Sequence, residues 1–268
     1  MGKATLVKPG SRVRLAEHDP DENGGLSKDA PEVEERLEAA RAKMTELQGR
    51  LYAESKQSLL IVLQAMDAGG KDGTIRHVMR GVNPQGCSVT SFKAPTAEEL
   101  AHDFLWRIHG HTPARGLIAV FNRSHYEDVL IVRVRKLAPK RVWSRRYAQI
   151  NAFEELLTEG GTRILKLFLH ISADEQKQRL EARLQDPTKC WKFNPEDLKE
   201  RERWDDYVTA YEEALTKCST PRAPWHIVPA NRKWYRNLVV AELVADTLEA
   251  MAPEWPAPAC DLEGIVVK

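Results

Sequence analysis

The sequence lacks the features of a membrane-spanning or exported protein. No stretch approaches the roughly 20 consecutive apolar residues that cross a bilayer, and no basic start leads into a continuous apolar run. The four cysteines form no CxxC pair and have no histidines at zinc-ligand spacing. These absences predict a cytoplasmic protein with reduced thiols, and they argue against a disulfide scaffold and a cysteine-based zinc site.

The chain also lacks an excess of charge of either sign. Its 40 basic and 39 acidic residues leave a net charge of +1, so no overall field draws it toward nucleic acid or a membrane. No internal repeat or low-complexity tract is present. With 268 residues, 42% of them apolar, the chain can bury one substantial core. We therefore expect a globular protein whose anion sites arise from local clusters of charge.

Apolar runs of strand length alternate with segments of helical length. Residues 59–63 (LLIVL) form an unbroken apolar run before a glycine-rich turn, as in a parallel strand that is buried on both faces. Residues 33–51 carry apolar side chains at steps of three and four, which is the stripe of an amphipathic helix. Further strands are expected at 88–92, 116–121, 164–171 and 225–228, and helices at 96–108 and 145–159. This order predicts an α/β fold with a doubly wound parallel sheet.

The segment 173–218 interrupts the alternation with two expected helices and no strand. The second helix is expected to start at Asn194, because asparagine caps free amides and the following proline and acidic residues suit a first turn. A helical hairpin between two strands of such a sheet is predicted to form a lid over a ligand site. The expected parts of the chain are an N-terminal arm (1–32), a main domain that includes the lid (33–251) and a C-terminal tail (252–268).

A glycine-rich loop follows the first expected strand. Residues 66–73 (MDAGGKDG) lead into a helix, which is the arrangement of a phosphate-binding loop. The glycines let successive amides face an anion, and Lys71 adds a full positive charge. The pattern is incomplete, because Ala65 replaces its first glycine and Asp72 stands where a metal-binding serine or threonine is usual. A glycine-rich turn without a ligand remains the alternative.

Charged residues accompany this loop. Asp67 puts a carboxylate inside an anion site, so we expect a magnesium ion between it and the phosphates, with a self-capping turn as the alternative. Asn122 and Arg123 follow the strand at 116–121, at the end of the strand where open α/β sheets bind ligands. Arg123 can stabilise a transferring phosphate, although a solvated loop arginine is possible. His125 shows no sign of being a nucleophile, and ordinary hydrogen bonding is expected for it.

A basic cluster lies between residues 133 and 146, where seven basic residues occur without an acidic one. Arg133, Lys136, Lys140 and Arg141 are its predicted polyanion-binding members, for polyphosphate or nucleic acid. Aromatic residues do not alternate with these charges at base-stacking spacing, which weakens the nucleic-acid interpretation. A solvated helix face remains the alternative.

Several ordered motifs together resemble the polyphosphate kinase 2 family. They are MDAGGKDG (66–73), VNPQG (82–86), NRSHYE (122–127), WKFNPED (191–197) and RWDDY (203–207). The resemblance covers about 33–251. It implies a three-layer P-loop kinase fold with a helical lid, a tendency to form homo-oligomers, and magnesium-dependent, reversible phosphoryl transfer between inorganic polyphosphate and nucleotides.

The resemblance also assigns roles to residues of this chain. Asp67 would bind magnesium or orient the acceptor phosphate, Lys71 and Arg123 would hold the reacting phosphates, and Arg183 on the first lid helix would close over them. Asn122, where many relatives have aspartate, and Glu127 resemble the branch that accepts AMP and ADP or their guanine equivalents. The implied reaction is direct in-line transfer without an enzyme nucleophile. The expected phosphate-binding residues are Ala68, Gly69, Gly70, Lys71, Asp72, Gly73 and Arg123.

Two other functions remain open at this point. The first is an ATP-dependent nucleotide or small-molecule kinase, which activity without polyphosphate would favour. The second is a noncatalytic nucleic-acid-binding module with a degenerate P-loop, which salt-sensitive binding to DNA or RNA without nucleotide turnover would favour. The expected partners are polyphosphate and nucleoside mono- and diphosphates, with neither nucleic acid nor a membrane.

Overall fold

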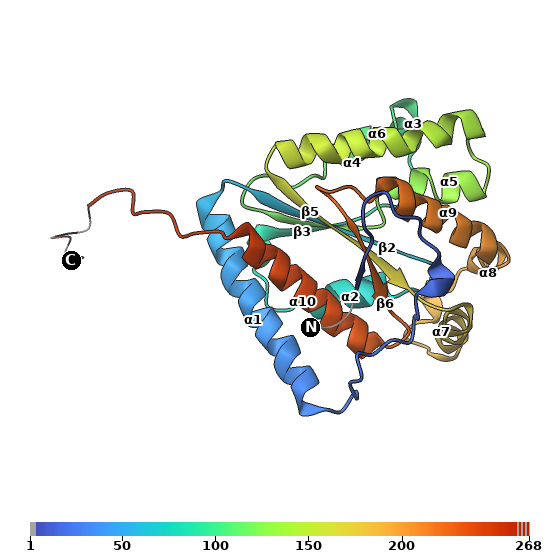
Figure 1. Cartoon of the computed structure of the whole chain (residues 1–268), viewed down its shortest axis with the longest axis horizontal. Helices are drawn as coiled ribbons and strands as arrows, with labels where there is room; N and C mark the ends of the chain where they lie inside the picture. Colours follow the sequence, from blue (N-terminus) through green and yellow to red (C-terminus); the bar gives the residue numbers. More distant parts are fainter. Residues whose placement is uncertain (1–3, 262, 264, 266, 268) are drawn as a thin grey trace.

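The computed structural model describes residues 4–261, 263, 265 and 267, except for the side chain of Lys192. One sheet contains Thr5–Leu6 (β1), Ser58–Ala65 (β2), Cys87–Ser91 (β3), Ile118–Asn122 (β4), Thr162–His170 (β5) and Trp225–Pro229 (β6). The strand order is β1-β6-β5-β2-β4-β3 (Figure 1). Strands β2 to β6 run parallel, and the N-terminal arm adds β1 antiparallel to β6 at the edge. The expected α/β fold is confirmed.

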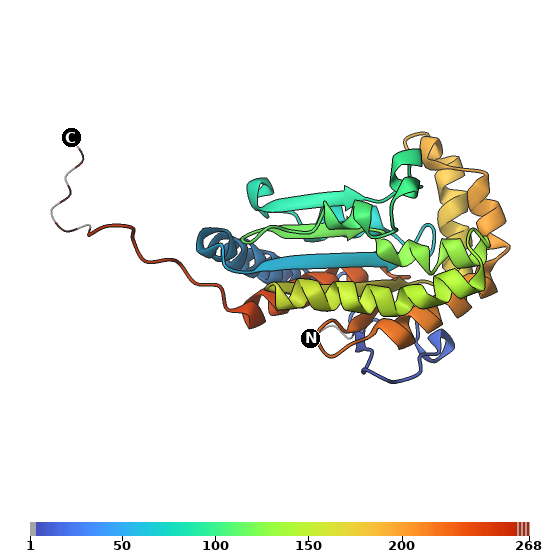
Figure 2. The same cartoon turned by 90° about the horizontal axis from the view of Figure 1, so that it is seen from above.

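Helices cover both faces of this sheet. The α-helices of the described chain are Pro31–Glu54 (α1), Lys71–Val78 (α2), Ala97–Ala101 (α3), Trp106–His109 (α4), Ile131–Val134 (α5), Lys140–Glu159 (α6), Ala173–Gln185 (α7), Glu196–Arg201 (α8), Trp204–Cys218 (α9) and Lys233–Met251 (α10). Helices α1, α2 and α10 lie on one face, and α6 and α9 lie on the other (Figures 1 and 2). Helices α7 and α8 lie beyond the carboxyl ends of the parallel strands (Figure 2).

The central strands have the composition of strands that are covered on both faces. All eight residues of β2 are buried, and β5 is buried along most of its length. A parallel strand between two helical layers has no solvated face, so an unbroken apolar run is stable there. No helix of the described residues is both long and apolar enough to cross a membrane.

Two expected helices are interrupted. The segment 96–108 forms α3 and α4 instead of one helix, since Asp103 Oδ1 accepts a hydrogen bond from the Leu105 amide and starts a separate turn. The second lid helix is divided into α8 and α9. Arg201 bonds to Ala173 O on α7, whereas Arg203 bonds to Val134 O on α5, so the chain changes direction between them.

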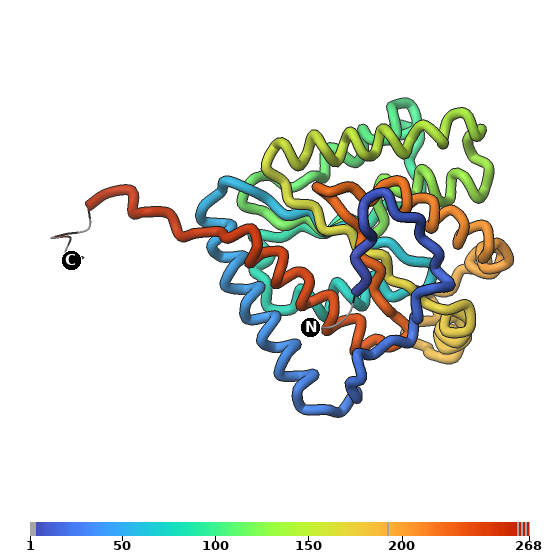
Figure 3. Tube along the Cα trace, viewed as in Figure 1, coloured from blue at the N-terminus to red at the C-terminus, as the bar shows by residue number. Residues whose placement is uncertain are grey.

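The predicted N-terminal arm and C-terminal tail differ in how they lie against the sheet and its helices. The arm runs beside β6 and α9, and the Val13 and Leu15 amides bond to Thr216 and Glu212 of α9 (Figure 3). The tail begins against α1, where the Glu254 amide donates to Glu54 Oε2 at 3.3 Å, and residues 256–261 then extend away from the body (Figure 3). Residues 1–3 of the predicted arm and 262, 264, 266 and 268 of the predicted tail lie outside the described residues.

Candidate functional site

The ends of two neighbouring strands bring predicted site residues together. In the register of β2 and β4, Leu63 lies opposite Asn122, so the segments that follow these strands leave the sheet at the same edge. There, Arg123 Nη2 donates a hydrogen bond to Asp67 Oδ1 at 2.9 Å. The lining of the adjacent cavity includes Asp67, Arg123, Glu127, Trp204, Tyr207 and Tyr211.

Strained backbone marks both sides of this ion pair. Ala68 and Arg123 have φ angles of 59° and 62°, a left-handed conformation that costs a residue with a side chain roughly 1–3 kcal/mol. Gly70 also has a positive φ of 96°, and a Cβ atom there would lie 2.1 Å from Arg236 Nη1. The surrounding contacts must therefore hold Ala68 and Arg123, and position 70 requires glycine.

Two side chains of α7 hold the predicted phosphate loop. Gln176 Nε2 donates to Asp67 O at 2.9 Å, and Arg179 Nη1 donates to Ala68 O at 3.0 Å. Neither residue is among the predicted site residues. Their spacing of three places them on one face of a helix, which is the signal in the sequence that could have indicated them.

Lys71 folds back onto its own loop. Its Nζ donates to Ala65 O at 3.1 Å, and the same carbonyl accepts a hydrogen bond from Tyr211 OH on α9 at 3.0 Å. Burial and the nearby Arg123 guanidinium lower the pKa of Lys71 to about 8. A phosphate anion beside this ammonium would favour its charged form.

Asn122, Asp72 and Glu127 are also held by neighbours. Asn122 Nδ2 donates to Asp72 Oδ1 at 2.7 Å and contacts Ser91 Oγ at 3.3 Å. With its amide oriented to satisfy both ends, Gln64 donates to Glu127 Oε1 at 3.1 Å. Hydrogen bonds therefore hold both predicted residues, and Glu127 lines the cavity together with Arg123, whereas Asn122 does not.

Arg123 is the central cation of the site. The negative charges of Glu127 and Asp67 raise the pKa of Arg123, although burial opposes them. Its side chain is 38% exposed, so a ligand phosphate can reach it. His125, two residues further on, is fully buried with Nε2 3.2 Å from Glu154 Oε1, an ordinary hydrogen-bonding position as expected.

Arg183 does not contact the Asp67–Arg123 pair directly. Its Nη1 atom lies 3.6 Å from Asp197 Oδ2 on α8, which joins the first two helices of the lid segment. Burial and the charge of Asp67 raise the pKa of Asp197. In this structure Arg183 therefore pairs with a carboxylate of α8, and its closing over the phosphates remains a prediction.

The basic cluster is partly neutralised by acids from other elements. Arg133 pairs with Glu213 of α9 and lies over the Trp143 ring, with its Cζ atom 4.7 Å from the ring centroid. Lys136, Lys140 and Arg141 are exposed and have no ion pair among the residues that the structure describes. Fewer residues of the basic cluster are therefore free to bind a polyanion than the sequence suggests. The folded chain brings acidic residues that are distant in the sequence, such as Glu213, next to the cluster.

The donor groups present fit a magnesium ion that substrate helps to hold. In the described part of the chain, no group of three His, Cys, Asp or Glu side chains is arranged to hold a metal ion. Magnesium commonly takes one or two protein carboxylates and completes its shell with water and substrate phosphates. The Asp67 side chain is 29% exposed, so it can provide such a carboxylate. Magnesium binding at Asp67 remains a prediction.

Comparison with known proteins agrees with the motifs. A family model described as Polyphosphate kinase 2 matches residues 26–256. The chain is 50% identical over 266 residues to the AMP/ADP-polyphosphate phosphotransferase of Meiothermus ruber, covering 99% of this chain and 100% of that protein. It is 48% identical over 226 residues to the ADP-polyphosphate phosphotransferase of Rhodopseudomonas palustris, covering 80% and 78% of the two chains.

A solved structure supports the same relationship. The crystal structure of Polyphosphate Kinase 2 from Arthrobacter aurescens matches with a TM-score of 0.89 and 46% sequence identity. The match covers 98% of this chain and 96% of that one. The similarity thus extends over nearly the whole fold, including β2, α7 and the loop after β4. The chain belongs to the polyphosphate kinase 2 family.

Proposed function

We propose that this protein transfers a phosphoryl group reversibly between inorganic polyphosphate and the nucleotides AMP and ADP. The observation that carries the proposal is the Asp67–Arg123 pair beside the strained, glycine-rich loop, at the edge of the sheet where β2 and β4 end. The similarity to the Meiothermus ruber AMP/ADP-polyphosphate phosphotransferase along the whole chain supports both acceptors.

The side chains suit a reaction that depends on positioning and charge neutralisation. In-line phosphoryl transfer needs little covalent help from the protein. Lys71 and the amides that follow Ala68 would hold a phosphate, and Arg123 would stabilise the charge of the transferring group. Magnesium bound at Asp67 would further neutralise the phosphate oxygens.

A phosphohistidine route has no support at this site. His125 is wholly buried, and its Nε2 atom faces the Glu154 carboxylate. Phosphorylation of the ring would require the loop after β4 to unpack from the core. Direct transfer between the two substrates is therefore the proposed route.

Acceptor choice is proposed to involve Asn122 and Glu127. Asn122 is tied to Asp72, and Glu127 is tied to Gln64, so both present fixed polar groups near Arg123. An amide at position 122 adds no charge to a site that already contains Asp67 and Glu127, which would ease the approach of acceptors with different numbers of phosphates. The homo-oligomer and the cytoplasmic location remain predictions.

The test is a turnover assay of the purified full chain with magnesium, long-chain polyphosphate and either AMP or ADP. Chromatography would measure ADP and ATP separately. We expect product from both acceptors, and product from one alone would restrict the acceptor range. Turnover that requires ATP and ignores polyphosphate would identify a conventional kinase and overturn the proposal.

A further inference from the structure

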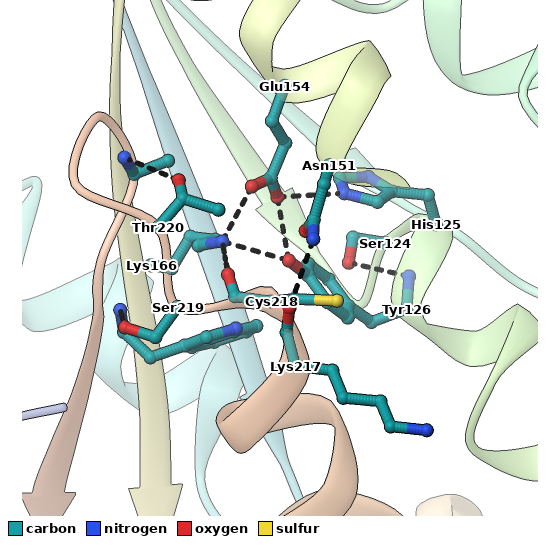
Figure 4. Close-up of polar contacts among 12 residues, drawn as sticks. Ser124, His125, Tyr126, Asn151, Glu154, Lys166, Lys217, Cys218, Ser219 and Thr220 are labelled. Atoms are coloured by element: carbon teal, nitrogen blue, oxygen red, sulfur yellow. Dashed lines mark hydrogen bonds and ion pairs between the residues drawn. The ribbon is translucent and has the colours of Figure 1, made fainter. Parts of the chain in front are cut away.

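A wholly buried polar cluster joins β5, α6 and the end of α9 to His125 and Tyr126, which follow Arg123 in the chain (Figure 4). Its centre is Lys166 on β5, whose Nζ atom contacts Glu154 Oε2 at 2.6 Å, Tyr126 OH at 2.9 Å and Cys218 O at 2.5 Å. The side chains of Lys166 and Glu154 are 0% and 1% exposed. None of these groups lines the cavity beside Asp67, so substrate cannot touch them there.

Glu154 connects this centre to the loop after β4. Its Oε1 atom accepts a hydrogen bond from Tyr126 OH at 2.8 Å and lies 3.2 Å from His125 Nε2 (Figure 4). Although burial opposes it, the charge of Lys166 lowers the pKa of Glu154, so the carboxylate remains ionised. Burial and the charge of Glu154 raise the pKa of Tyr126, so its hydroxyl remains a donor. Two consecutive loop residues are thereby fixed to α6.

These fixed residues lie between two groups of the proposed active site. Arg123 precedes His125 and Tyr126 in the chain, and Glu127 follows them. Arg123 has a left-handed backbone with φ of 62°, a conformation that persists only where the surroundings hold it. On one side, the Arg123 amide donates to Leu63 O at 3.1 Å. The buried cluster provides the anchor on the other side.

Lys166 also holds the opposite wall of the cavity. Cys218 is the last residue of α9, and an ammonium at a helix C-terminus interacts favourably with the terminal carbonyls and the helix dipole. The same helix contributes Trp204, Tyr207 and Tyr211 to the cavity lining. One buried cation therefore ties the Arg123 loop and α9 to the same point of β5.

A gain in folding stability does not explain why the Lys166–Glu154 pair is buried. Desolvation of two charges offsets much of their attraction, and well-packed apolar residues in place of a buried ion pair are often neutral or stabilising. A directional network does, however, select one relative position of the elements that it joins. Here those elements are the two walls of the reaction site.

We propose that the Lys166–Glu154 pair, acting through His125 and Tyr126, positions Arg123 and Glu127 against α9 and thereby sets the rate of phosphoryl transfer. Lys166 and Glu154 are positioning residues, since they act through the loop rather than on substrate. The inference rests on the proposed phosphotransfer function. It predicts a larger change in kcat than in KM, because Arg123 would stabilise the transferring group while the predicted phosphate loop, residues 66–73, makes no contact with the cluster.

The test is the double variant Lys166→Met/Glu154→Leu of the full chain, which removes both charges and leaves neither one buried alone. We expect kcat to fall about 10- to 100-fold, as misplacement of catalytic groups by about 1 Å can produce, while KM for polyphosphate and nucleotide changes less than about threefold. Leu248→Ala on α10 is the matched control, since this buried residue lies on the helix that packs against α1. It should lower the thermal midpoint and leave kcat unchanged.

A second, milder variant guards against misfolding of the first. Tyr126→Phe removes only the hydroxyl that bridges Lys166 and Glu154, and it should lower kcat by a smaller factor at unchanged KM. Crystal structures of both variants should show Arg123 displaced from Asp67. Wild-type kcat in Tyr126→Phe together with an undisturbed Arg123–Asp67 pair would overturn the inference. A kcat loss in the double variant no larger than that in Leu248→Ala would overturn it as well.

Different results would refute the proposed function and the positioning role of Lys166 and Glu154. A wild-type chain that does not use polyphosphate in the turnover assay would refute the function. The displacement of Arg123 in the variant structures would still test the positioning role, because that measurement does not depend on activity.

Discussion

At the scale of single residues, opposite charges meet where the strands β2 and β4 end. Asp67 and Arg123 are 56 positions apart in the chain, and their side chains form a 2.9 Å ion pair. Both are partly exposed, so the pair contributes little to stability in water. The placement of these two side chains is better explained by a ligand that would bind between them.

The first prediction concerns Asp67→Asn. We expect transfer activity to fall at least about 100-fold, because the amide cannot bind a cation or orient a phosphate as the carboxylate can. The thermal midpoint should change little, since the side chain is partly exposed. Turnover assays and thermal unfolding measure the two effects, with the surface variant Glu46→Gln as control. Near-normal activity would refute the role of Asp67.

The second prediction concerns the pH dependence that Lys71 produces. Its pKa of about 8 means that the ammonium loses its charge as pH rises through that value. We therefore expect kcat/KM for polyphosphate to fall above about pH 8. In Lys71→Arg, whose guanidinium stays charged, any remaining activity should not show this fall. An identical pH profile in both proteins would assign the titration to another group.

The same shift has an opposite effect on stability. The folded pKa of Lys71 lies below its ordinary value of 10.5, so between about pH 8 and that value the unfolded chain binds more protons. The contribution of Lys71 to the free energy of unfolding therefore rises with pH across this window. Below pH 8, burial of the charged ammonium is a constant cost.

At the scale of elements, side chains of α7 form hydrogen bonds with the predicted phosphate loop. Arg179 is 8% exposed and donates to Ala68 O, while Glu175 and the carbonyls of Ala230 and Asn231 take its other donors. It joins the predicted phosphate loop to the segment that follows β6. Movement of α7 as a lid would therefore break bonds to the loop.

The third prediction is that Arg179→Met lowers kcat/KM by about tenfold or more and destabilises the fold. Each lost hydrogen bond to a charged donor contributes about 1.5–3 kcal/mol, and the strained Ala68 backbone loses its support. Lys177→Met on the exposed face of the same helix is the matched control, since Lys177 makes only a long contact with Glu181. Equal effects of the two variants, measured by turnover and urea unfolding, would contradict the role of Arg179.

At the scale of the whole molecule, the N-terminal arm completes the fold. It adds β1 to the edge of the sheet, and it buries Val7, Val13 and Leu15. Full burial of each such side chain contributes about 1.5–3 kcal/mol relative to exposure. The arm also covers a strand edge that would otherwise invite pairing with other chains.

The fourth prediction is that removal of residues 1–16 lowers the thermal midpoint strongly and promotes aggregation. Removal of residues 257–268 is the control, and we expect it to change the midpoint little, because its described residues are exposed. Calorimetry and light scattering would measure both. An unchanged midpoint after removal of the arm would show that the β1–β6 pairing contributes nothing to stability.

Sequence reasoning reached the α/β fold, the order of the parallel strands along the chain and the family. Apolar runs such as 59–63 indicate buried strands, because a strand covered on both faces needs apolar side chains at every position. The helix expected at 96–108 and the lid helix expected from Asn194 are each divided in two, because side chains bond to nearby or distant backbone groups there. The roles of the site residues remain predictions, and the variants above test those of Asp67 and Lys71.

The sequence by itself determined which charged residues and glycines belong to the site. The loop 66–73 and the motif 122–127 are short continuous segments, so their residue types can be recognised without the fold. Only the tertiary structure decided that Asp67 pairs with Arg123, that Arg183 pairs with Asp197, and that acids on other elements neutralise part of the basic cluster. It alone placed Lys166 beside Glu154 in the core. Such pairings depend on strand register and helix packing, which no local pattern specifies.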